Sequence, residues 1–311
     1  MNILFLGTPE FAVPTLKLLT QTRHRILAAL TQPDRPKGRG MKLIPSPVKT
    51  IALEYGLLVM QPERASSAFV IEEIRNLNPD AAVVVAYGQI LRRDFLDLPV
   101  RGCINLHPSL LPRYRGPTPI QSAIMAGDHI TGVTTMLLDE GMDTGDILLQ
   151  REVVIHDDDT LGTMHDTLAG AGADLMVETL GALEMGSATP RKQDDSKATI
   201  TRKLTREDEI INWNRSPEAI HNLVRALDPW PGCATTYRGE TLKVWKVGPW
   251  DEQTRGGEPG EIIMSARGLL LVRAAAGAVR LLEVQPQGGR RMSVEEYLRG
   301  HALEEGGVLG K

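Results

Sequence analysis

An asparagine and a histidine two residues apart form the most chemically suggestive pattern of the sequence. Asn105 and His107 follow the apolar residues Cys103 and Ile104. Because side chains alternate along a strand, Asn105 and His107 leave the same face and can converge on one reacting atom. The asparagine amide can donate a hydrogen bond to a developing oxyanion, and the histidine can change charge near neutral pH. The alternative interpretation is that Asn105 caps a turn and that His107 is a partly buried histidine with its hydrogen bonds satisfied.

An acidic run with two glycines is the second chemical feature. Residues 139–146 read Asp-Glu-Gly-Met-Asp-Thr-Gly-Asp, so Gly141 and Gly145 flank Asp143. The glycines let the backbone turn sharply and bring this carboxylate into a cleft, where it can hold a charged histidine or order a water that relays a proton. The run is also compatible with a metal site or with a solvated turn. No cysteine or second histidine has metal-ligand spacing here, so we expect no metal.

Together the two runs resemble the formyltransferase family that uses 10-formyltetrahydrofolate. The family pattern Asn-x-His-x-Ser-Leu-Leu-Pro matches residues 105–112 without a gap, and Asp143 follows His107 by 36 residues. The resemblance implies that Asn105, His107 and Asp143 are the catalytic residues and that a reduced folate is the co-substrate. The residues implied to line the folate pocket are Tyr87, Gly88, Gln89, Ile90, Leu91, Ser109, Leu110, Leu111, Pro112, Asp139 and Gly141.

The chemistry of formyl transfer agrees with this set of residues. An amine attacks the formyl carbon, so the site must stabilise an oxyanion and carry a proton away from the amine. Asn105 and, if protonated, His107 can donate to the oxyanion, and Asp143 can assist the proton transfer. No covalent intermediate is required, and Cys103 lies in an apolar run that is typical of a core. A nicotinamide or flavin cofactor is not expected, because the turn after the first predicted strand has one glycine where a dinucleotide fingerprint needs three.

A basic segment rich in glycine and proline follows the second predicted strand. It indicates which kind of molecule accepts the formyl group. Residues 35–49 contain five basic residues and no acidic one. On charge alone the segment is also typical of a solvated loop. As a whole it resembles the loop with which family members that act on methionyl-tRNA enter the acceptor stem. The resemblance implies formyl transfer to the α-amino group of methionyl initiator tRNA, for translation initiation, and tRNA contacts from Arg35, Lys37, Arg39 and Lys42.

The elements that must position these residues follow from the hydrophobic pattern. Over the first half of the chain, short apolar runs alternate with helical patterns, which indicates βαβ units and an α/β fold with a Rossmann-like parallel sheet. A long helix is predicted over residues 160–183, with Asp159 as its N-cap. In such a sheet, sites form at the carboxyl ends of strands, where Asn105 and His107 lie. The runs predicted as strands are residues 2–6, 26–30, 81–86, 103–106 and 133–138.

The last third of the chain has a different pattern. Residues 186–208 are small, polar and charged, as in a linker. After a predicted helix at residues 217–227, five short β-type runs are separated by glycine-containing turns, which favours an OB-like β-barrel. We predict a formyltransferase catalytic domain at residues 1–189, a linker at residues 190–207 and a C-terminal OB-like tRNA-binding domain at residues 208–311. The five runs are residues 234–237, 241–247, 261–264, 268–273 and 278–284.

The charge and the cysteine content restrict the class of protein. A formal net charge of -4 argues against nucleic-acid binding over the whole surface, so we expect a focused contact with tRNA from residues 35–49 and from the basic residues of the linker. The two cysteines fall in different predicted domains, which fits a reducing compartment. The apolar start of the chain is too short for a signal peptide or a membrane span. We therefore expect a cytoplasmic protein and a monomer.

Three other functions share features of this sequence. In an amino-sugar formyltransferase, the basic segment would contact a nucleotide diphosphate. In a formyltetrahydrofolate hydrolase, water would be the acceptor, and the basic segment and the barrel would lack a purpose. A catalytically silent tRNA-binding protein would not need Asn105, His107 and Asp143, all of which are present.

Overall fold

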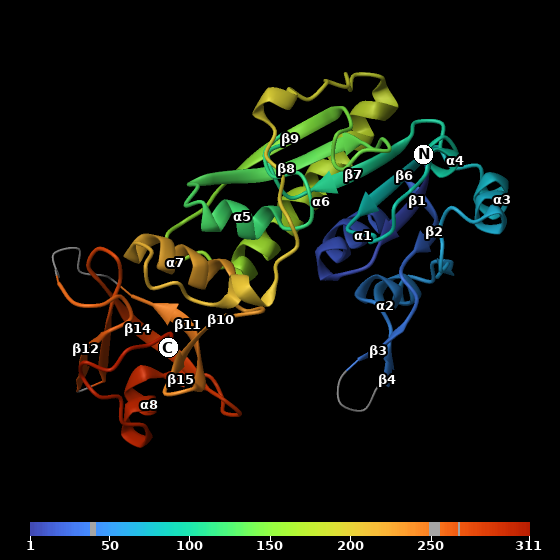
Figure 1. Cartoon of the computed structure of the whole chain (residues 1–311). Helices are drawn as coiled ribbons and strands as arrows, with labels where there is room; N and C mark the ends of the chain where they lie inside the picture. The colour runs from blue at the N-terminus through green and yellow to red at the C-terminus, as the bar shows by residue number, and fades with distance from the viewer. Residues whose placement is uncertain (38–41, 249–255, 267) are drawn as a thin grey trace. The chain divides into compact units, whose positions relative to one another are not determined.

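The computed structural model describes residues 1–37, 42–248, 256–266 and 268–311 (Figure 1). By its internal contacts the chain divides into two compact units, and each unit is assembled from three separate stretches of sequence. Unit 1 comprises Met1–Pro119, Ile130–Val154 and His165–Thr201, and unit 2 comprises Ile120–His129, Ile155–Met164 and Arg202–Lys311.

A seven-stranded sheet forms the centre of unit 1, in the order β5-β2-β1-β6-β7-β8-β9. The first five strands in this order run parallel, whereas β8 is antiparallel to both of its neighbours. The order reverses between β1 and β6, which is where open sheets of this type place their sites. The strands are β1 (Asn2–Gly7), β2 (Arg25–Leu30), β5 (Val59–Met60), β6 (Ala81–Val85), β7 (Cys103–His107), β8 (Ile130–Leu137) and β9 (Ile147–Val154).

Helices cover both faces of this sheet, so β6 is buried along its whole length, as its apolar run predicts. On one face, a core cluster joins residues of α3 and α4 to Leu4, Leu6 and Val84. On the other face, Leu106 of β7 lies so close to α6 that a Cβ on Gly172 would approach its side chain to 2.5 Å. The helices of the first 200 residues are α1 (Val13–Thr20), α2 (Pro47–Glu54), α3 (Ala68–Leu77), α4 (Arg93–Leu96), α5 (Pro119–Met125) and α6 (Leu161–Met185).

The basic segment after β2 forms a two-stranded hairpin of β3 (Arg35–Lys37) and β4 (Lys42–Ile44). The helix α2 begins directly after it, with Ser46 as the N-cap: its hydroxyl accepts a hydrogen bond from the Lys49 N–H, and Pro47 occupies the first helical position. Before α2 begins at Pro47, the described residues of the segment are therefore not helical. Residues 38–41, which include the predicted tRNA contact Arg39, lie outside the described part of the chain.

Unit 2 contains an antiparallel sheet in the order β10-β11-β14-β13-β12, with β15 paired to β14. All five strands predicted for the last third of the chain are present, which confirms a C-terminal β-unit. A core of aliphatic residues and Trp213 lies between this sheet and its helices. The elements are α7 (Pro217–Ala226), β10 (Cys233–Tyr237), β11 (Glu240–Val247), β12 (Ile262–Ala266), β13 (Leu269–Arg273), β14 (Ala278–Pro286), β15 (Met292–Ser293) and α8 (Val294–Gly300).

The side chain of Arg225 in α7 joins two of the three stretches of unit 2, Ile155–Met164 and Arg202–Lys311. This arginine is only 8% exposed, and its guanidinium donates to the carbonyl oxygens of His156 (3.0 Å) and Asp159 (3.1 Å) and to the side chain of Asn222 (2.9 Å). His221, one turn earlier, contacts the carbonyl oxygen of Asp157 at 3.0 Å. The last stretch of the chain therefore supplies the donors for backbone groups near residue 157.

Two details differ from the sequence-based expectations. The edge strand β9 was not predicted, because its charged residues Arg151 and Glu152 break the apolar run, which an edge strand open on one side tolerates. The prediction of Asp159 as the N-cap of the long helix is wrong by one residue. The Thr160 hydroxyl accepts from the Thr163 N–H at 3.3 Å, whereas Asp159 accepts from the His156 N–H at 2.8 Å.

No helix in the described ranges is both long enough and apolar enough to span a membrane.

Candidate active site

His107, the last residue of β7, lies between two hydrogen-bond acceptors. Its side chain is 6% exposed, its Nε2 donates to the carbonyl oxygen of Tyr114 at 3.0 Å, and its Nδ1 lies 3.6 Å from Oδ2 of Asp143. The second distance is longer than a hydrogen bond, so the carboxylate acts on the ring through its charge. The structure therefore brings together His107 and Asp143, two of the three residues predicted to be catalytic.

The protonation of His107 depends on opposing influences. Burial lowers the pKa of His107 from its ordinary value, and the carboxylate of Asp143 and the carbonyl of Tyr114 oppose this shift. The ring is therefore neutral near pH 7, with its proton on Nε2, where the Tyr114 carbonyl needs a donor. Nδ1 is then free of a proton and can accept one, and Asp143 stabilises the imidazolium that forms.

Asn105 is the third predicted catalytic residue, and it stands two positions before His107 on the same face of β7. It pairs with Val84 on one side and Met136 on the other, and it is partly exposed. Within the described ranges, no hydrogen bond of its side-chain amide to the protein is present. The NH₂ group of Asn105 is thus able to donate to a reacting carbonyl oxygen.

The loop that carries Asp143 joins β8 to β9 and is held by its own polar groups. Asp143 has a left-handed backbone (φ 55°), and its Oδ2 accepts from the Gly116 N–H at 2.7 Å. Asp139 accepts from the Gly141 N–H (2.9 Å) and from the Thr144 hydroxyl (2.7 Å). Asp139 and Gly141, both predicted to bind folate, therefore also give this loop its shape.

The Ser-Leu-Leu-Pro run folds over β8 and β9 and delivers the Tyr114 carbonyl to His107. The Ser109 hydroxyl donates to the Arg113 carbonyl at 2.6 Å, and the Thr134 hydroxyl donates to the Ser109 carbonyl at 2.6 Å. Leu111 is buried against Met136 and Ile147, and Leu110 lies against Gly132. The peptide bond before Pro112 is cis. Three members of the predicted folate-binding run, Ser109, Leu110 and Leu111, thus make internal contacts.

The segment after β6, predicted to border the folate, is anchored to the ends of β1 and β2. The Tyr87 carbonyl accepts from the Thr8 hydroxyl (2.9 Å) and from the Gln32 side chain (3.2 Å). Gln89 donates to the Pro62 carbonyl at 2.9 Å and accepts from the Ala65 N–H at 2.7 Å. Along this segment, Tyr87 and Leu91 are buried, Gly88 has a φ of 87°, and Ile90 is 87% exposed.

The Tyr87 hydroxyl is a buried polar group that has no hydrogen-bond partner among the described residues. Burial raises the pKa of Tyr87 to about 12, so the phenol is uncharged. A buried donor without a partner costs free energy, about 1–3 kcal/mol in general, and such groups are often satisfied by a ligand or by water. Within the same segment, the apolar side chain of Ile90 is exposed. A buried hydroxyl and an exposed apolar side chain thus lie on the segment that the sequence predicts to border the folate.

Sequence reasoning missed three groups of the site. The Tyr114 carbonyl and the Gly116 N–H act through the backbone, so their residue types carry no signal. The Gln193 side chain donates to the carbonyl oxygens of Asp143 and Gly145, both at 2.8 Å. Gln193 falls in a segment with the composition of a linker and lies 50 residues from Asp143. Nothing in the spacing indicated that it would meet the loop.

The predicted tRNA contacts lie on the β3–β4 hairpin. Arg35 is exposed and its backbone pairs with that of Ile44, and the backbone of Lys37 pairs with that of Lys42. At the base of the hairpin, Asp34 forms a 2.6 Å ion pair with Lys49. Hydrogen bonds from Lys49 and Gln61 hold the pKa of Asp34 below its ordinary value, so one charge of the basic segment is neutralised.

Both cysteines are buried free thiols. Burial raises the pKa of Cys103 and of Cys233 to about 12, so neither is a thiolate at physiological pH. In the described chain, no group of three or more His, Cys, Asp or Glu side chains has the arrangement of a metal site.

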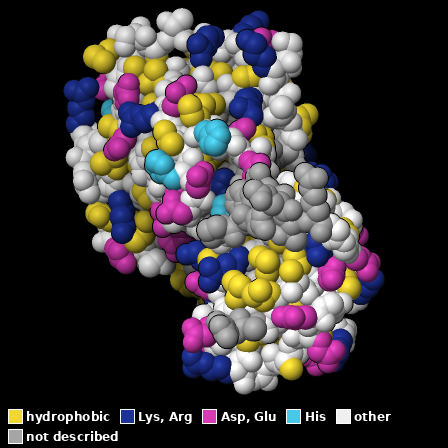
Figure 2. All heavy atoms as spheres, turned by 90° about the vertical axis from the view of Figure 1, so that its left-hand side faces the viewer, with side chains coloured by type: hydrophobic (Ala, Val, Ile, Leu, Met, Phe, Trp, Pro, Cys, Tyr) yellow, Lys and Arg dark blue, Asp and Glu magenta, His cyan; other side chains and the backbone are white. Residues whose placement is uncertain are grey.

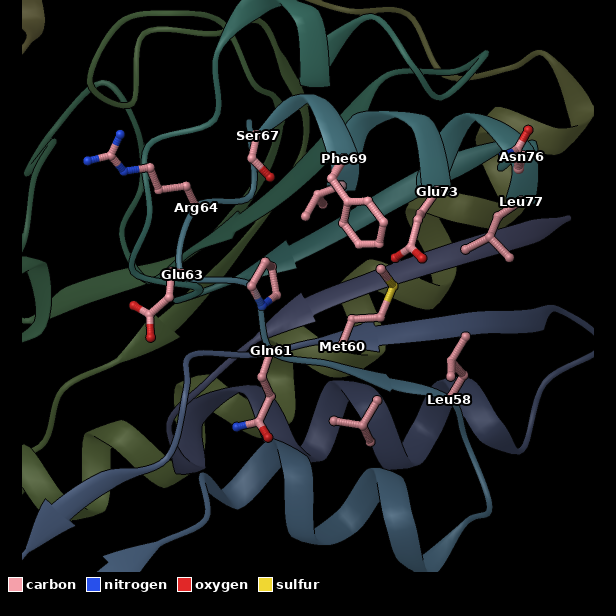
Figure 3. A pocket seen from close by; sticks show the side chains of 13 residues that line it. Leu58, Met60, Gln61, Glu63, Arg64, Ser67, Phe69, Glu73, Asn76 and Leu77 are labelled. Carbon is pink, nitrogen blue, oxygen red and sulfur yellow. The ribbon is translucent and has the colours of Figure 1, made fainter.

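A separate pocket of about 880 Å³ lies between β5 and α3 (Figure 3). Phe69 and Glu73 point from α3 toward Met60 of β5. The residues that line it include none of the predicted catalytic or folate-binding residues.

The chain matches two family models and is similar over its full length to curated proteins. Residues 1–180 match the model described as "Formyl transferase", and residues 203–302 match "Formyl transferase, C-terminal domain". A methionyl-tRNA formyltransferase of Caldanaerobacter subterraneus is 47% identical over 310 residues, covering 99% of this chain and 100% of that protein. One of Geobacter metallireducens is 46% identical and covers 100% of this chain and 99% of that protein.

Solved structures share the fold at low sequence identity. A methionyl-tRNA formyltransferase from Clostridium thermocellum has a TM-score of 0.56 and 17% identity, covering 80% of this chain and 93% of that one. A sugar 3N-formyl transferase, WlaRD, has a TM-score of 0.65 and 17% identity, covering 90% and 97%. HypX from Aquifex aeolicus, in complex with tetrahydrofolic acid, has a TM-score of 0.63 and 18% identity, covering 95% and 46%.

Proposed function

The chain belongs to the formyltransferase family, and from this membership we propose that it transfers the formyl group of 10-formyltetrahydrofolate to the α-amino group of methionyl initiator tRNA. The product is N-formylmethionyl-tRNA for translation initiation. The observation that carries the proposal is the full-length similarity, at 44–47% identity across both domains, to proteins named methionyl-tRNA formyltransferase.

The geometry at the end of β7 supports a catalytic role for each of three residues. Asn105 donates a hydrogen bond to the formyl oxygen as negative charge develops on it. His107, neutral before the reaction, accepts the proton that the attacking amine loses and donates a proton to N10 of the folate as the bond between N10 and the formyl carbon breaks. Asp143 stabilises the resulting imidazolium across 3.6 Å. Because these groups hold and move protons without forming a covalent bond to the formyl carbon, the transfer is direct.

The two substrates use different parts of unit 1 in this proposal. The folate lies along residues 87–91 and against the loop of Asp139 and Gly141, with its ring beside Ile90. The tRNA acceptor end contacts the β3–β4 hairpin through Arg35, Lys37, Arg39 and Lys42. The face of the molecule in Figure 2 mixes dark blue Lys and Arg with magenta Asp and Glu, so a focused basic contact suits the net charge of -4 better than a broad one.

The proposal also covers the domain organisation, the oligomeric state and the cellular compartment of the protein. We assign catalysis to residues 1–189, further tRNA contacts to residues 208–311, and the connection to residues 190–207. The protein acts in the cytoplasm as a monomer, where charged tRNA is available and where the buried thiols of Cys103 and Cys233 stay reduced.

An acceptor comparison tests the function. The protein is given 10-formyltetrahydrofolate labelled in the formyl group, with charged initiator tRNA, charged elongator tRNA, an amino-sugar nucleotide or water alone as the acceptor. We expect label on the methionine of initiator tRNA at the highest kcat/KM. Label that appears mainly on the amino-sugar nucleotide, or mainly as free formate, would replace the proposal with the corresponding alternative.

A further inference from the structure

Gln193 lies in a chain of hydrogen bonds that ends at the Asp143 loop. Its Nε2 donates to the carbonyl oxygens of Asp143 and Gly145, so one amide group holds the backbone on both sides of Thr144. Its Oε1 accepts from Nε of Arg115 at 3.0 Å. The amide is therefore oriented, because the guanidinium requires an acceptor and the two carbonyl oxygens require donors.

Arg115 is itself fixed by main-chain and side-chain contacts. It is 6% exposed, and its NH2 group donates to Asp195 at 2.7 Å. Its N–H donates to the Thr199 carbonyl at 2.8 Å, and its carbonyl accepts from the Thr201 N–H at 2.7 Å. Residues 191–201 thus run beside the loop that carries Arg115 and connect it to the loop that carries Asp143.

Arg115 lies in the sequence between two residues whose backbone groups bind His107 and Asp143. The residue before it, Tyr114, supplies the carbonyl that orients His107, and the residue after it, Gly116, supplies the N–H that binds Asp143. Tyr114 and Asp143 both have left-handed backbones, with φ of 60° and 55°. Non-glycine residues persist in that region when surrounding contacts impose it, often at functional sites.

We propose that Arg115 and Gln193 are positioning residues, which hold the carboxylate of Asp143 at the ring of His107 during formyl transfer. This inference rests on the proposed function, since it assumes that Asp143 and His107 are catalytic. The Gly116 N–H binds the Asp143 carboxylate and Asp139 binds Gly141 and Thr144, whereas the Gln193 amide binds the main chain of the loop at Asp143 and at Gly145. Without the Gln193 amide, the loop relaxes and the distance from Oδ2 to the ring increases.

Substitution of Gln193 tests the proposal directly. Gln193→Ala removes both donors, and Gln193→Glu keeps an acceptor for Arg115 but sets a carboxylate oxygen against two carbonyl oxygens. We expect kcat to fall by about 10- to 100-fold in both variants, the scale of a misplaced catalytic group, with KM changed by less than about 3-fold. Gln21→Ala, at the exposed end of α1, is the matched control and should behave as wild type.

The pH profile separates positioning from a general loss of folded protein. The Asp143 carboxylate raises the pKa of His107 against the effect of burial, so a carboxylate that moves away lowers that pKa. The limb of the kcat profile that reports His107 should move to lower pH in Gln193→Ala. A variant that simply unfolds more easily loses amplitude at every pH and keeps the limb in place. An unmoved limb together with a normal melting temperature would overturn the proposal.

A double-mutant cycle distinguishes failure of this inference from failure of the proposed roles. If Gln193 acts through Asp143, adding Gln193→Ala to Asp143→Ala should reduce kcat by less than about 3-fold further. Arg115→Lys should retain more activity than Arg115→Ala, because an ammonium can still reach one acceptor. Normal kcat in both Gln193 variants, with an inactive Asp143→Ala, would refute the positioning role alone. Normal kcat in Asp143→Ala would refute the catalytic assignment on which it rests.

Discussion

The three predicted catalytic residues differ in whether other groups of the protein already bind their side chains. Asn105 has an amide with no protein partner in the described chain, whereas His107 and Asp143 are held by the Tyr114 carbonyl and the Gly116 N–H. We expect Asn105→Ala and Asp143→Ala each to lower kcat by about 100-fold, the usual effect of removing an oxyanion donor or an acid–base partner. His107→Asn should do the same. Single-turnover formylation with saturating folate measures the chemical step.

The same variants need a folding control. Asn105 is partly exposed and Asp143 lies in a loop, so their removal should leave the thermal midpoint within a few degrees of wild type. Wild-type kcat in either variant would show that the oxyanion donor or the proton-transfer partner has been assigned to the wrong residue.

The buried thiols predict a pH dependence of stability. Both cysteines have a folded pKa of about 12 against an ordinary value of 9.0, so above pH 9 the unfolded chain releases thiol protons that the folded chain keeps. The stabilisation is complete below pH 9 and is lost as the pH rises toward 12. Urea unfolding at pH 8 and pH 10 measures the loss. The Cys103→Ala, Cys233→Ala double variant should lose less over the same interval, and an equal loss would contradict the assignment.

The β3–β4 hairpin is the element on which the tRNA proposal depends. Arg35→Ala removes an exposed cation from β3 without touching the Asp34–Lys49 ion pair at its base. We expect weaker formylation of methionyl-tRNA and a salt dependence of KM that is flatter by about one counterion. Arg93→Ala, which removes an exposed arginine from α4, is the control. A salt dependence that is equal in the two variants would remove the hairpin from the tRNA interface.

The prediction of helices and strands was correct where a single hydrophobic periodicity dominates the sequence. The buried strand at residues 81–86 and the five C-terminal strands are present, because their apolar residues face a core on one or both sides. The direction of β8 was not predictable, since the apolar run at residues 133–138 has the same pattern in a parallel or an antiparallel strand. For the site, the Asn-x-His spacing placed two side chains on one face. The backbone groups and Gln193 depend on tertiary contacts that no local pattern encodes.

For the whole molecule, we expect the binding of a reduced folate to raise the thermal stability. A folate that binds only the folded protein raises the free energy of unfolding, by about 2.7 kcal/mol at a concentration 100 times its Kd. We expect 10-formyltetrahydrofolate or a stable reduced folate to raise the thermal midpoint, and NAD and ATP to leave it unchanged. Differential scanning calorimetry with each compound measures this. A larger shift with NAD than with folate would contradict the folate assignment.

The assembly of unit 2 from three stretches has a consequence for how the protein is made. Residues 120–129 and 155–164 leave the ribosome well before residues 202–311, yet the carbonyl oxygens of His156 and Asp159 receive their hydrogen bonds from Arg225. Until residue 225 has been synthesised, the Asp159 carbonyl oxygen lacks the donor that it has in the folded chain, and the His156 carbonyl oxygen has only the Asp159 N–H. A nascent chain that stalls after residue 201 therefore carries an unfinished surface in the middle of its sequence. Translation of residues 202–311 thus completes a unit whose first two stretches lie near the middle of the sequence.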